Sequence, residues 1–146
     1  MESEKLKSLV KETYGEIAKK SSLQLAATTC CGTQCCGPES GDAPHDFTPF
    51  NDDYTKLAGY NKDADLLLGC GMPTEIAAIS PGDTVLDLGS GAGNDVFVAR
   101  ALVGETGKVI GLDMTEAMIE KALKNAATLG YANVEFRLGD IEAMPI

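Results

Sequence analysis

Residues 84–95, TVLDLGSGAGND, decide the fold of this chain. The first half is an apolar run (Val85, Leu86, Leu88) that starts on β-branched residues, a pattern typical of a buried strand. Asp87 interrupts the run, and glycines follow at positions 89, 91 and 93. Apolar residues then recur at helical spacing: Val96, Val98, Ala99 and Leu102. This pattern predicts a strand, a glycine-rich turn and a helix, the first half of a nucleotide-binding βαβ unit.

The spacing of the glycines indicates which ligand the turn accepts. A dinucleotide fingerprint, G-x-G-x-x-G, that begins at Gly89 requires glycine at position 94, where this chain has Asn94. Asp87 also lies two residues before the first glycine, where its carboxylate would repel a pyrophosphate. A ligand that carries an ammonium and a sulfonium group would instead be attracted. The turn therefore favours a cationic ligand over a dinucleotide.

The rest of the chain continues the unit. A second strand over residues 108–112 ends in Asp113, twenty residues after Gly93, where a carboxylate can accept two hydrogen bonds from ribose hydroxyls. Thr115 is expected to cap a helix over residues 116–129 that Gly130 ends. Its inward residues are Met118, Ile119, Ala122 and Ala126. A third strand over residues 134–138 leads to Gly139, Asp140 and Ile141. Three parallel strands with flanking helices make this an incomplete Rossmann-like α/β fold, whose first strand keeps an open hydrogen-bonding edge.

Residues 1–80 form a second part, before the Rossmann-like part at residues 81–146. An amphipathic helix is predicted over residues 2–22, with one apolar face made of Leu6, Leu9, Val10, Tyr14, Ile17 and Ala18. A docked helix of this kind is more common than one with a direct catalytic role. Pro73 suits the first position of a short helix over residues 73–79.

Five cysteines point to soft-ligand chemistry. Two vicinal pairs, Cys30–Cys31 and Cys35–Cys36, lie in a stretch too rich in Gly, Pro and Ser for regular structure. Such pairs can bring thiolates together around a thiophilic metal or metalloid. The alternative interpretation is that these thiols are prone to oxidation and have no dedicated ligand. Cys70 lies between two glycines just before the 73–79 helix, where a thiolate is favoured; a small buried cysteine in a tight bend is the alternative.

Composition narrows the range of partners. The chain has 146 residues, 44% of them apolar, and a net charge of −10. This charge argues against nucleic acid as a partner, because phosphate binding needs clustered Lys and Arg. The sequence lacks an apolar run long enough to cross a membrane, and its charged N-terminus is unlike a signal peptide. We therefore expect a cytoplasmic protein without a membrane partner.

The cofactor motifs resemble the class I S-adenosylmethionine-dependent methyltransferases, whose first motif is an acidic residue followed by GxGxG. The segment LGCGMP and the CC…CC pairs extend this resemblance to the arsenite S-adenosylmethionine methyltransferases over nearly the whole chain. The resemblance implies that Cys70 binds trivalent arsenic as the catalytic cysteine, together with Cys30, Cys31, Cys35 or Cys36. It implies cofactor binding by Asp87, Gly89, Ser90, Gly91, Gly93, Asp113, Met114, Asp140 and Ile141, with Asp140 at the adenine amino group. A thiol reductant would be a further partner.

Members of that family are longer and have two further arsenic-binding cysteines. We therefore expect the chain to be an N-terminal fragment that binds the cofactor weakly and turns over inefficiently. Two alternatives remain. The first is a methyltransferase for another small molecule, which would have no need of Cys70. The second is a non-catalytic protein that binds arsenite but not S-adenosylmethionine, in which Asp113→Ala would have no effect.

Overall fold

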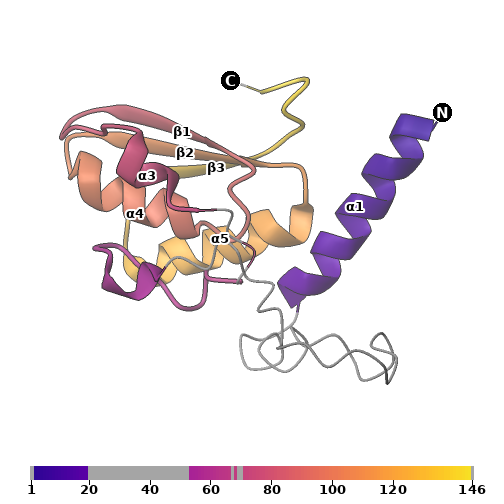
Figure 1. Ribbon diagram of the computed structural model, residues 1–146, viewed down its shortest axis with the longest axis horizontal. Helices are drawn as coiled ribbons and strands as arrows, with labels where there is room; N and C mark the ends of the chain where they lie inside the picture. The colour runs from indigo at the N-terminus through magenta and orange to yellow at the C-terminus, as the bar shows by residue number, and fades with distance from the viewer. Residues whose placement is uncertain (1, 20–52, 67, 69–70, 146) are drawn as a thin grey trace, which may run out of the picture.

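Three parallel strands form one sheet in the order β1-β2-β3 (Figure 1). They are β1 (Thr84–Leu88), β2 (Lys108–Asp113) and β3 (Val134–Leu138). This computed structural model describes residues 2–19, 53–66, 68 and 71–145. The predicted strands and their parallel arrangement are confirmed. Among the strands described, β1 pairs with β2 alone and so forms an edge of the sheet.

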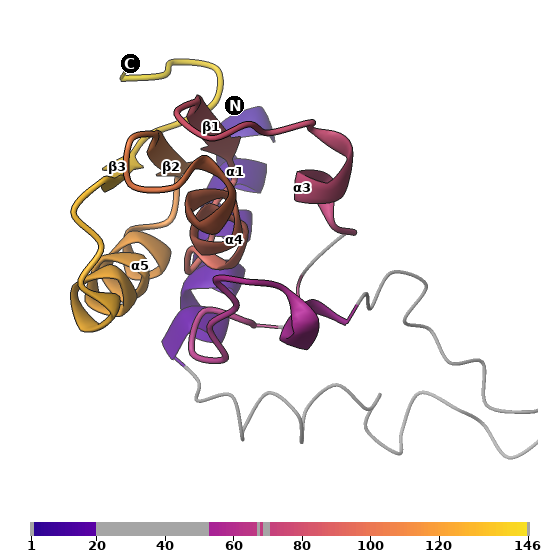
Figure 2. The same cartoon turned by 90° about the vertical axis from the view of Figure 1, so that its left-hand side faces the viewer.

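Two helices cover one face of the sheet: α4 (Asn94–Val103) and α5 (Glu116–Leu129) (Figures 1 and 2). The core lies beneath them and is centred on Phe97, whose side chain is fully buried. The Phe97 ring meets the Phe136 ring edge-on, with centroids 5.9 Å apart, and tilts against Tyr131 at the same distance. Leu102, one of the apolar residues at helical spacing, is 40% exposed, because the face of α4 that carries Phe97 is the one packed on the sheet.

The prediction that β1 is a buried strand is wrong. Its residues alternate between exposed and half-buried, and Leu86 and Leu88 are 39% and 46% exposed. Val85 packs against the core on the face that α4 and α5 cover, whereas Leu86 and Leu88 point to the opposite face, since side chains alternate along a strand. Burial of β1 is therefore one-sided.

Helix α1 (Glu2–Lys19) packs against α5, and the side chain of Lys121 donates a hydrogen bond to the Ala18 carbonyl at 3.3 Å. The predicted apolar face is covered only in part. Ala18 is buried and Val10 half-buried, whereas Leu6 and Leu9 are 63% and 59% exposed. Residues 20–22, also predicted to be helical, lie outside the described residues.

The short helices precede the sheet. They are the 3-10 helix η1 (Tyr54–Lys56) and α3 (Pro73–Ile76). The predicted start of α3 at Pro73 is confirmed, but the predicted end at residue 79 is wrong. Ala78 has a φ of +50°, in the left-handed region, so the chain leaves the helix before a turn in which the Asp83 carboxylate accepts the Ser80 N–H at 2.8 Å.

Candidate functional site

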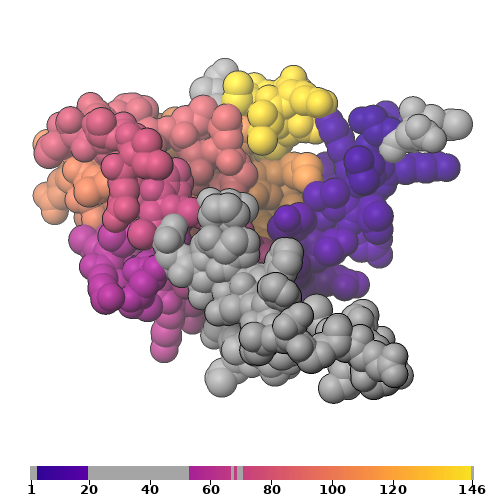
Figure 3. Space-filling model, in the orientation of Figure 1, coloured from indigo at the N-terminus to yellow at the C-terminus, as the bar shows by residue number. Residues whose placement is uncertain are grey.

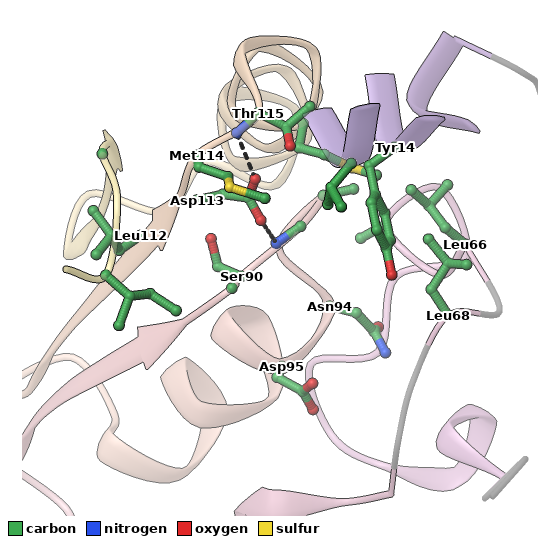
Figure 4. A pocket seen from close by; sticks show the side chains of 18 of the residues that line it. Tyr14, Leu66, Leu68, Ser90, Asn94, Asp95, Leu112, Asp113, Met114 and Thr115 are labelled. Atoms are coloured by element: carbon green, nitrogen blue, oxygen red, sulfur yellow. Dashed lines mark hydrogen bonds between the residues drawn. The ribbon is translucent and has the colours of Figure 1, made fainter. Parts of the chain in front are cut away.

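A cavity of about 480 Å³ opens where the three strands end. Its floor comes from residues that follow β1, β2 and β3, and its walls come from α1 and the segment around η1 (Figure 4). The residues that line it are Val10, Tyr14, Tyr54, Ala64, Asp65, Leu66, Leu68, Gly89, Ser90, Gly91, Ala92, Asn94, Asp95, Leu112, Asp113, Met114, Thr115, Met118, Gly139, Asp140 and Ile141. Ligands of open parallel sheets bind at this edge, and the volume suits a small molecule.

The glycine-rich turn is tied to the end of β2. The Gly89 and Ser90 N–H groups both donate to the Leu112 carbonyl, at 2.8 and 3.0 Å. Gly93 must be glycine, since its φ is +98° and a Cβ there would lie 2.8 Å from the Phe136 ring. Buried Asn125 of α5 donates to the Ala92 carbonyl at 3.2 Å and so holds the turn from below.

Asp113 joins this turn to the next helix. One carboxylate oxygen accepts the Gly91 N–H at 3.0 Å, and the other accepts the Thr115 N–H at 2.7 Å (Figure 4). Thr115 is the N-cap residue of α5 as predicted, but its side chain makes no capping hydrogen bond; its own N–H donates to the Asp113 carboxylate instead. Asp113 thus shapes the pocket, and each oxygen keeps a lone pair for a ligand hydroxyl.

Asp140 lies at the far side of the same pocket and is paired with α1. The Lys7 ammonium donates to the Asp140 carboxylate at 2.8 Å and also contacts Glu142. The hydrogen bond from Lys7 lowers the pKa of Asp140. In the space-filling view the C-terminal segment, yellow, lies against α1, indigo (Figure 3). The ion pairs therefore fasten α1 beside the pocket.

Carboxyl groups dominate the electrostatics of the pocket. Burial, and then the charges of Asp95 and Asp113, raises the pKa of Asp87 to about 6. Burial also raises the pKa of Asp95, against a hydrogen bond from Tyr54 that lowers it. Each shift shows that a carboxylate here lacks a compensating positive charge. A cationic ligand would supply one.

Two polar atoms of the pocket also fit a ligand. Ser90 Oγ and Asn94 Oδ1 are buried, and among the described residues neither has a hydrogen-bond partner. Buried polar atoms are almost always hydrogen-bonded, so an unpaired one indicates a position where a bound ligand supplies the partner. Figure 4 shows Ser90 beside Asp113 and Met114, and the Tyr14 side chain of α1 extending toward Asn94. The pocket thus has polar groups at both ends.

The structure brings most of the predicted cofactor-binding residues together. Gly89, Ser90, Gly91, Asp113, Met114, Asp140 and Ile141 all line the cavity. Asp87 and Gly93 do not line it; Asp87 acts on it through its charge, and Gly93 through the shape of the turn. Cys30, Cys31, Cys35, Cys36 and Cys70 lie outside the described residues. Within the described part of the chain, no three His, Cys, Asp or Glu side chains are arranged to hold a metal ion.

Several pocket residues were not predicted from the sequence. They are Tyr14, Tyr54, Asp65, Asn94 and Asp95. Asn94 and Asp95 had a local signal, because they follow Gly93 directly in the first turn of α4. Tyr54 and Tyr14 had none, since each reaches the pocket from a segment remote in sequence.

We expect Asp87→Asn to stabilise the chain and weaken the binding of a cationic ligand. The folded chain keeps the Asp87 proton to a higher pH than the unfolded chain, so ionisation of Asp87 lowers stability as the pH rises from about 4 to about 6. The variant avoids this loss, and its free energy of unfolding at pH 7.5 should be higher by up to about 3 kcal/mol.

Urea unfolding at two pH values tests this. The gain from Asp87→Asn should be roughly half as large at pH 5 as at pH 7.5, because at pH 5 the folded chain still keeps most of the proton. Glu105→Gln is the matched control, since Glu105 is exposed and does not line the pocket. An equal gain from Asp87→Asn at both pH values would contradict the assignment.

The sequence of this chain is similar to those of known methyltransferases. Residues 79–146 match the model of a methyltransferase domain family. The chain is 42% identical to an arsenite methyltransferase of Halobacterium salinarum, over 98% of this chain and 37% of that protein. It is 45% identical to an arsenite methyltransferase of Aquipseudomonas alcaligenes, over 51% of this chain and 22% of that protein. The chain thus spans well under half the length of these curated relatives.

One similar solved structure is an arsenic(III) S-adenosylmethionine methyltransferase from Chlamydomonas reinhardtii. It is 46% identical, covering 44% of this chain and 24% of that chain, with a TM-score of 0.40. The family and sequence matches confirm the predicted methyltransferase class and support S-adenosylmethionine as its cofactor. None of the described helices is long and apolar enough to span a membrane.

Proposed function

Residues 79–146 belong to the methyltransferase domain family, and from this premise we propose that the chain is part of a cytoplasmic arsenite methyltransferase. The observation that carries the proposal is the match over 98% of the chain to an arsenite methyltransferase. A match of that extent includes the cysteine-rich stretch, which lies outside the methyltransferase-domain match. The substrate would be trivalent arsenic bound by thiolates, and the biological role detoxification.

The proposal gives the cofactor a definite orientation in the pocket. Asp113 would accept the ribose hydroxyls, and Asp140 would accept the adenine amino group while Ile141 and Met114 pack beside the ring. The glycine turn allows close backbone approach, and Asp87 and Asp95 supply negative charge for the ammonium and sulfonium groups. S-adenosylmethionine, when bound, supplies a methyl group on a positively charged sulfur.

The cysteines would bind and orient the substrate. Trivalent arsenic takes three soft ligands and keeps a lone pair, so Cys70 with two N-terminal thiolates could hold it with that lone pair exposed. Holding the arsenic beside the methyl group supplies proximity and orientation, and no strong base is needed. Methylation oxidises arsenic, so a thiol reductant would return it to the trivalent state. In this proposal residues 1–80 bind arsenic and cover the pocket, while residues 81–146 bind the cofactor.

Arsenite titration tests the proposal. We expect Cys70→Ser to weaken arsenite binding at least tenfold, in the presence and absence of S-adenosylmethionine, because one of three thiolate ligands is lost. Cofactor affinity should stay within about twofold. Ser80→Ala, at an exposed turn, is the control. Arsenite binding that ignores Cys70 while the cofactor still binds would indicate a different substrate.

A further inference from the structure

The hydroxyl of Tyr54 lies between two acceptors that belong to different parts of the chain. It is within hydrogen-bond distance of Asp95 Oδ1, at 2.9 Å, and it also contacts the carbonyl oxygen of Gly71. Asp95 is in the first turn of α4, and both Tyr54 and Asp95 line the pocket. Gly71 directly follows Cys70. Tyr54 is buried, 6% exposed, and its hydroxyl contacts two partners that are each half-buried.

A proton count shows that this arrangement has two states. A tyrosine hydroxyl has one proton to donate, a carbonyl oxygen only accepts, and an ionised carboxylate only accepts. When Asp95 is protonated, it can donate to the Tyr54 oxygen while Tyr54 donates to Gly71, and all three groups are satisfied. When Asp95 is ionised, it competes with Gly71 for the single Tyr54 proton. A charged acceptor makes the stronger hydrogen bond, so the Tyr54 hydroxyl then donates to Asp95 instead of Gly71.

We propose that Tyr54 is a positioning residue that couples the charge on Asp95, in the cofactor pocket, to the backbone at Gly71, beside Cys70. The neutral pocket keeps Tyr54 on the Gly71 carbonyl. Ionisation of Asp95 turns the Tyr54 proton toward the carboxylate and releases that carbonyl. The hydroxyl thus reports the charge state of the pocket to the segment that carries Cys70.

The surroundings of Asp95 make both states accessible. Burial is the main cause of its raised pKa, and the negative charge of Asp65 adds to it, while the hydrogen bond from Tyr54 works in the opposite direction. Asp87, at the end of β1, is a third carboxyl group within electrostatic range of Asp95. The Tyr60 hydroxyl donates to Asp65 at 3.1 Å. Asp65 and Asp87, the two carboxyl groups of the described residues that act on Asp95, therefore both oppose its ionisation.

A cationic cofactor would operate this coupling. Resting on the proposed function, S-adenosylmethionine places positive charge next to Asp95 and favours the carboxylate. The Asp95 proton passes to water. The Tyr54 hydroxyl keeps its own proton and turns its hydrogen bond from the Gly71 carbonyl to the Asp95 carboxylate, and no other bond changes. Binding of the cofactor would therefore release the Gly71 carbonyl, which lies next to Cys70 in the chain, from Tyr54.

The rate at which Cys70 reacts with iodoacetamide tests the coupling. The parent chain carries Cys30, Cys31, Cys35 and Cys36 replaced by Ser, so that Cys70 is the only thiol. At pH 5.5 we expect Tyr54→Phe to react faster than the parent, by up to the three- to tenfold factor that one ordinary hydrogen bond carries, because the protonated fraction of Asp95 leaves the Tyr54 hydroxyl on Gly71. By pH 8 the ratio of the two rates should fall toward one, because in the parent the Tyr54 hydroxyl then donates to ionised Asp95 and no longer to Gly71. The dependence of thiolate formation on pH cancels in this ratio.

Two further variants sharpen the test. In Asp95→Asn the amide donates to the Tyr54 oxygen at every pH, so Cys70 should stay slow at both pH 5.5 and pH 8. Tyr60→Phe removes a neighbouring hydroxyl that does not contact Gly71, and it should react as the parent does. A Tyr54→Phe ratio that is the same at both pH values, or an Asp95→Asn variant that follows the parent, would overturn the proposal.

Saturation with S-adenosylmethionine at pH 5.5 separates this proposal from the proposed function. The ratio of Tyr54→Phe to parent should fall toward one, since shielding of Cys70 affects both chains alike. A cofactor that binds without changing the ratio would overturn the coupling. If the parent binds no S-adenosylmethionine at all, the proposed function fails, while the two pH values still decide whether Tyr54 couples Asp95 to Gly71.

Discussion

Asp113→Ala will weaken the binding of S-adenosylmethionine about 100-fold, equivalent to about 2.7 kcal/mol. The substitution removes both proposed acceptors of the ribose hydroxyls. It also removes the acceptors of the Gly91 and Thr115 N–H groups, which fix the glycine turn and the start of α5. A hydrogen bond to a charged group contributes about 1.5–3 kcal/mol, so the loss of several partners accounts for the expected effect. Isothermal titration of the variant against the unsubstituted chain measures it.

Two companion variants identify the cause of that loss. Asp113→Asn keeps one carboxamide oxygen as an acceptor and should lose only about tenfold in affinity. Glu116→Ala removes an exposed carboxylate from the first turn of α5, three residues away, and should leave cofactor affinity within about twofold. Equal affinity of Asp113→Ala and the unsubstituted chain would show that the cofactor does not use this carboxylate.

Phe97→Ala will lower the free energy of unfolding by about 3–5 kcal/mol. Phe97 is fully buried, packs against the rings of Tyr131 and Phe136, and joins α4 to β3 through the core. Its removal leaves a cavity that the surrounding helices and strands fill only in part. The same cavity lies beneath Gly93, so the glycine turn and the cofactor pocket lose support with it.

Urea unfolding compares Phe97→Ala with Leu102→Ala on the same helix. Leu102 is 40% exposed, so its truncation should cost less than about 1.5 kcal/mol. The comparison isolates burial from helix propensity, since both variants place alanine in α4. Similar losses for the two variants would mean that the core is not centred on Phe97.

The elements that could be predicted from the sequence are those set by local signals. Helix α5 begins after Thr115 and ends at Gly130, which has a φ of +69° as a helix-ending glycine requires. The turn after β1 and Asp113 at the end of β2 were likewise predicted from spacing, whereas the role of Asp140 after β3 came from the family resemblance. These features place Asp113 and Asp140 in one pocket, because the carboxyl ends of parallel strands meet at one edge of a sheet.

The features that could not be predicted depend on tertiary contacts. Lys7 and Asp140 are 133 residues apart, and Tyr54 and Asp95 are 41 residues apart. Neither contact can therefore be predicted from a local sequence pattern. The exposure of Leu86 and Leu88 depends on which face α4 and α5 cover, which hydrophobicity alone does not reveal. The early end of α3 follows from the left-handed backbone at Ala78, a residue type with no preference for that conformation.

The most direct test of the account is whether one chain binds both ligands at once. Native mass spectrometry of the reduced chain, with S-adenosylhomocysteine and arsenite both present, measures the mass of the complex. We predict one nucleoside ligand and one arsenic per chain, with Asp113→Ala losing only the nucleoside ligand and Cys70→Ser losing only the arsenic. Chains that carry either ligand but never both would contradict an arsenic methyltransferase site built from this pocket and Cys70.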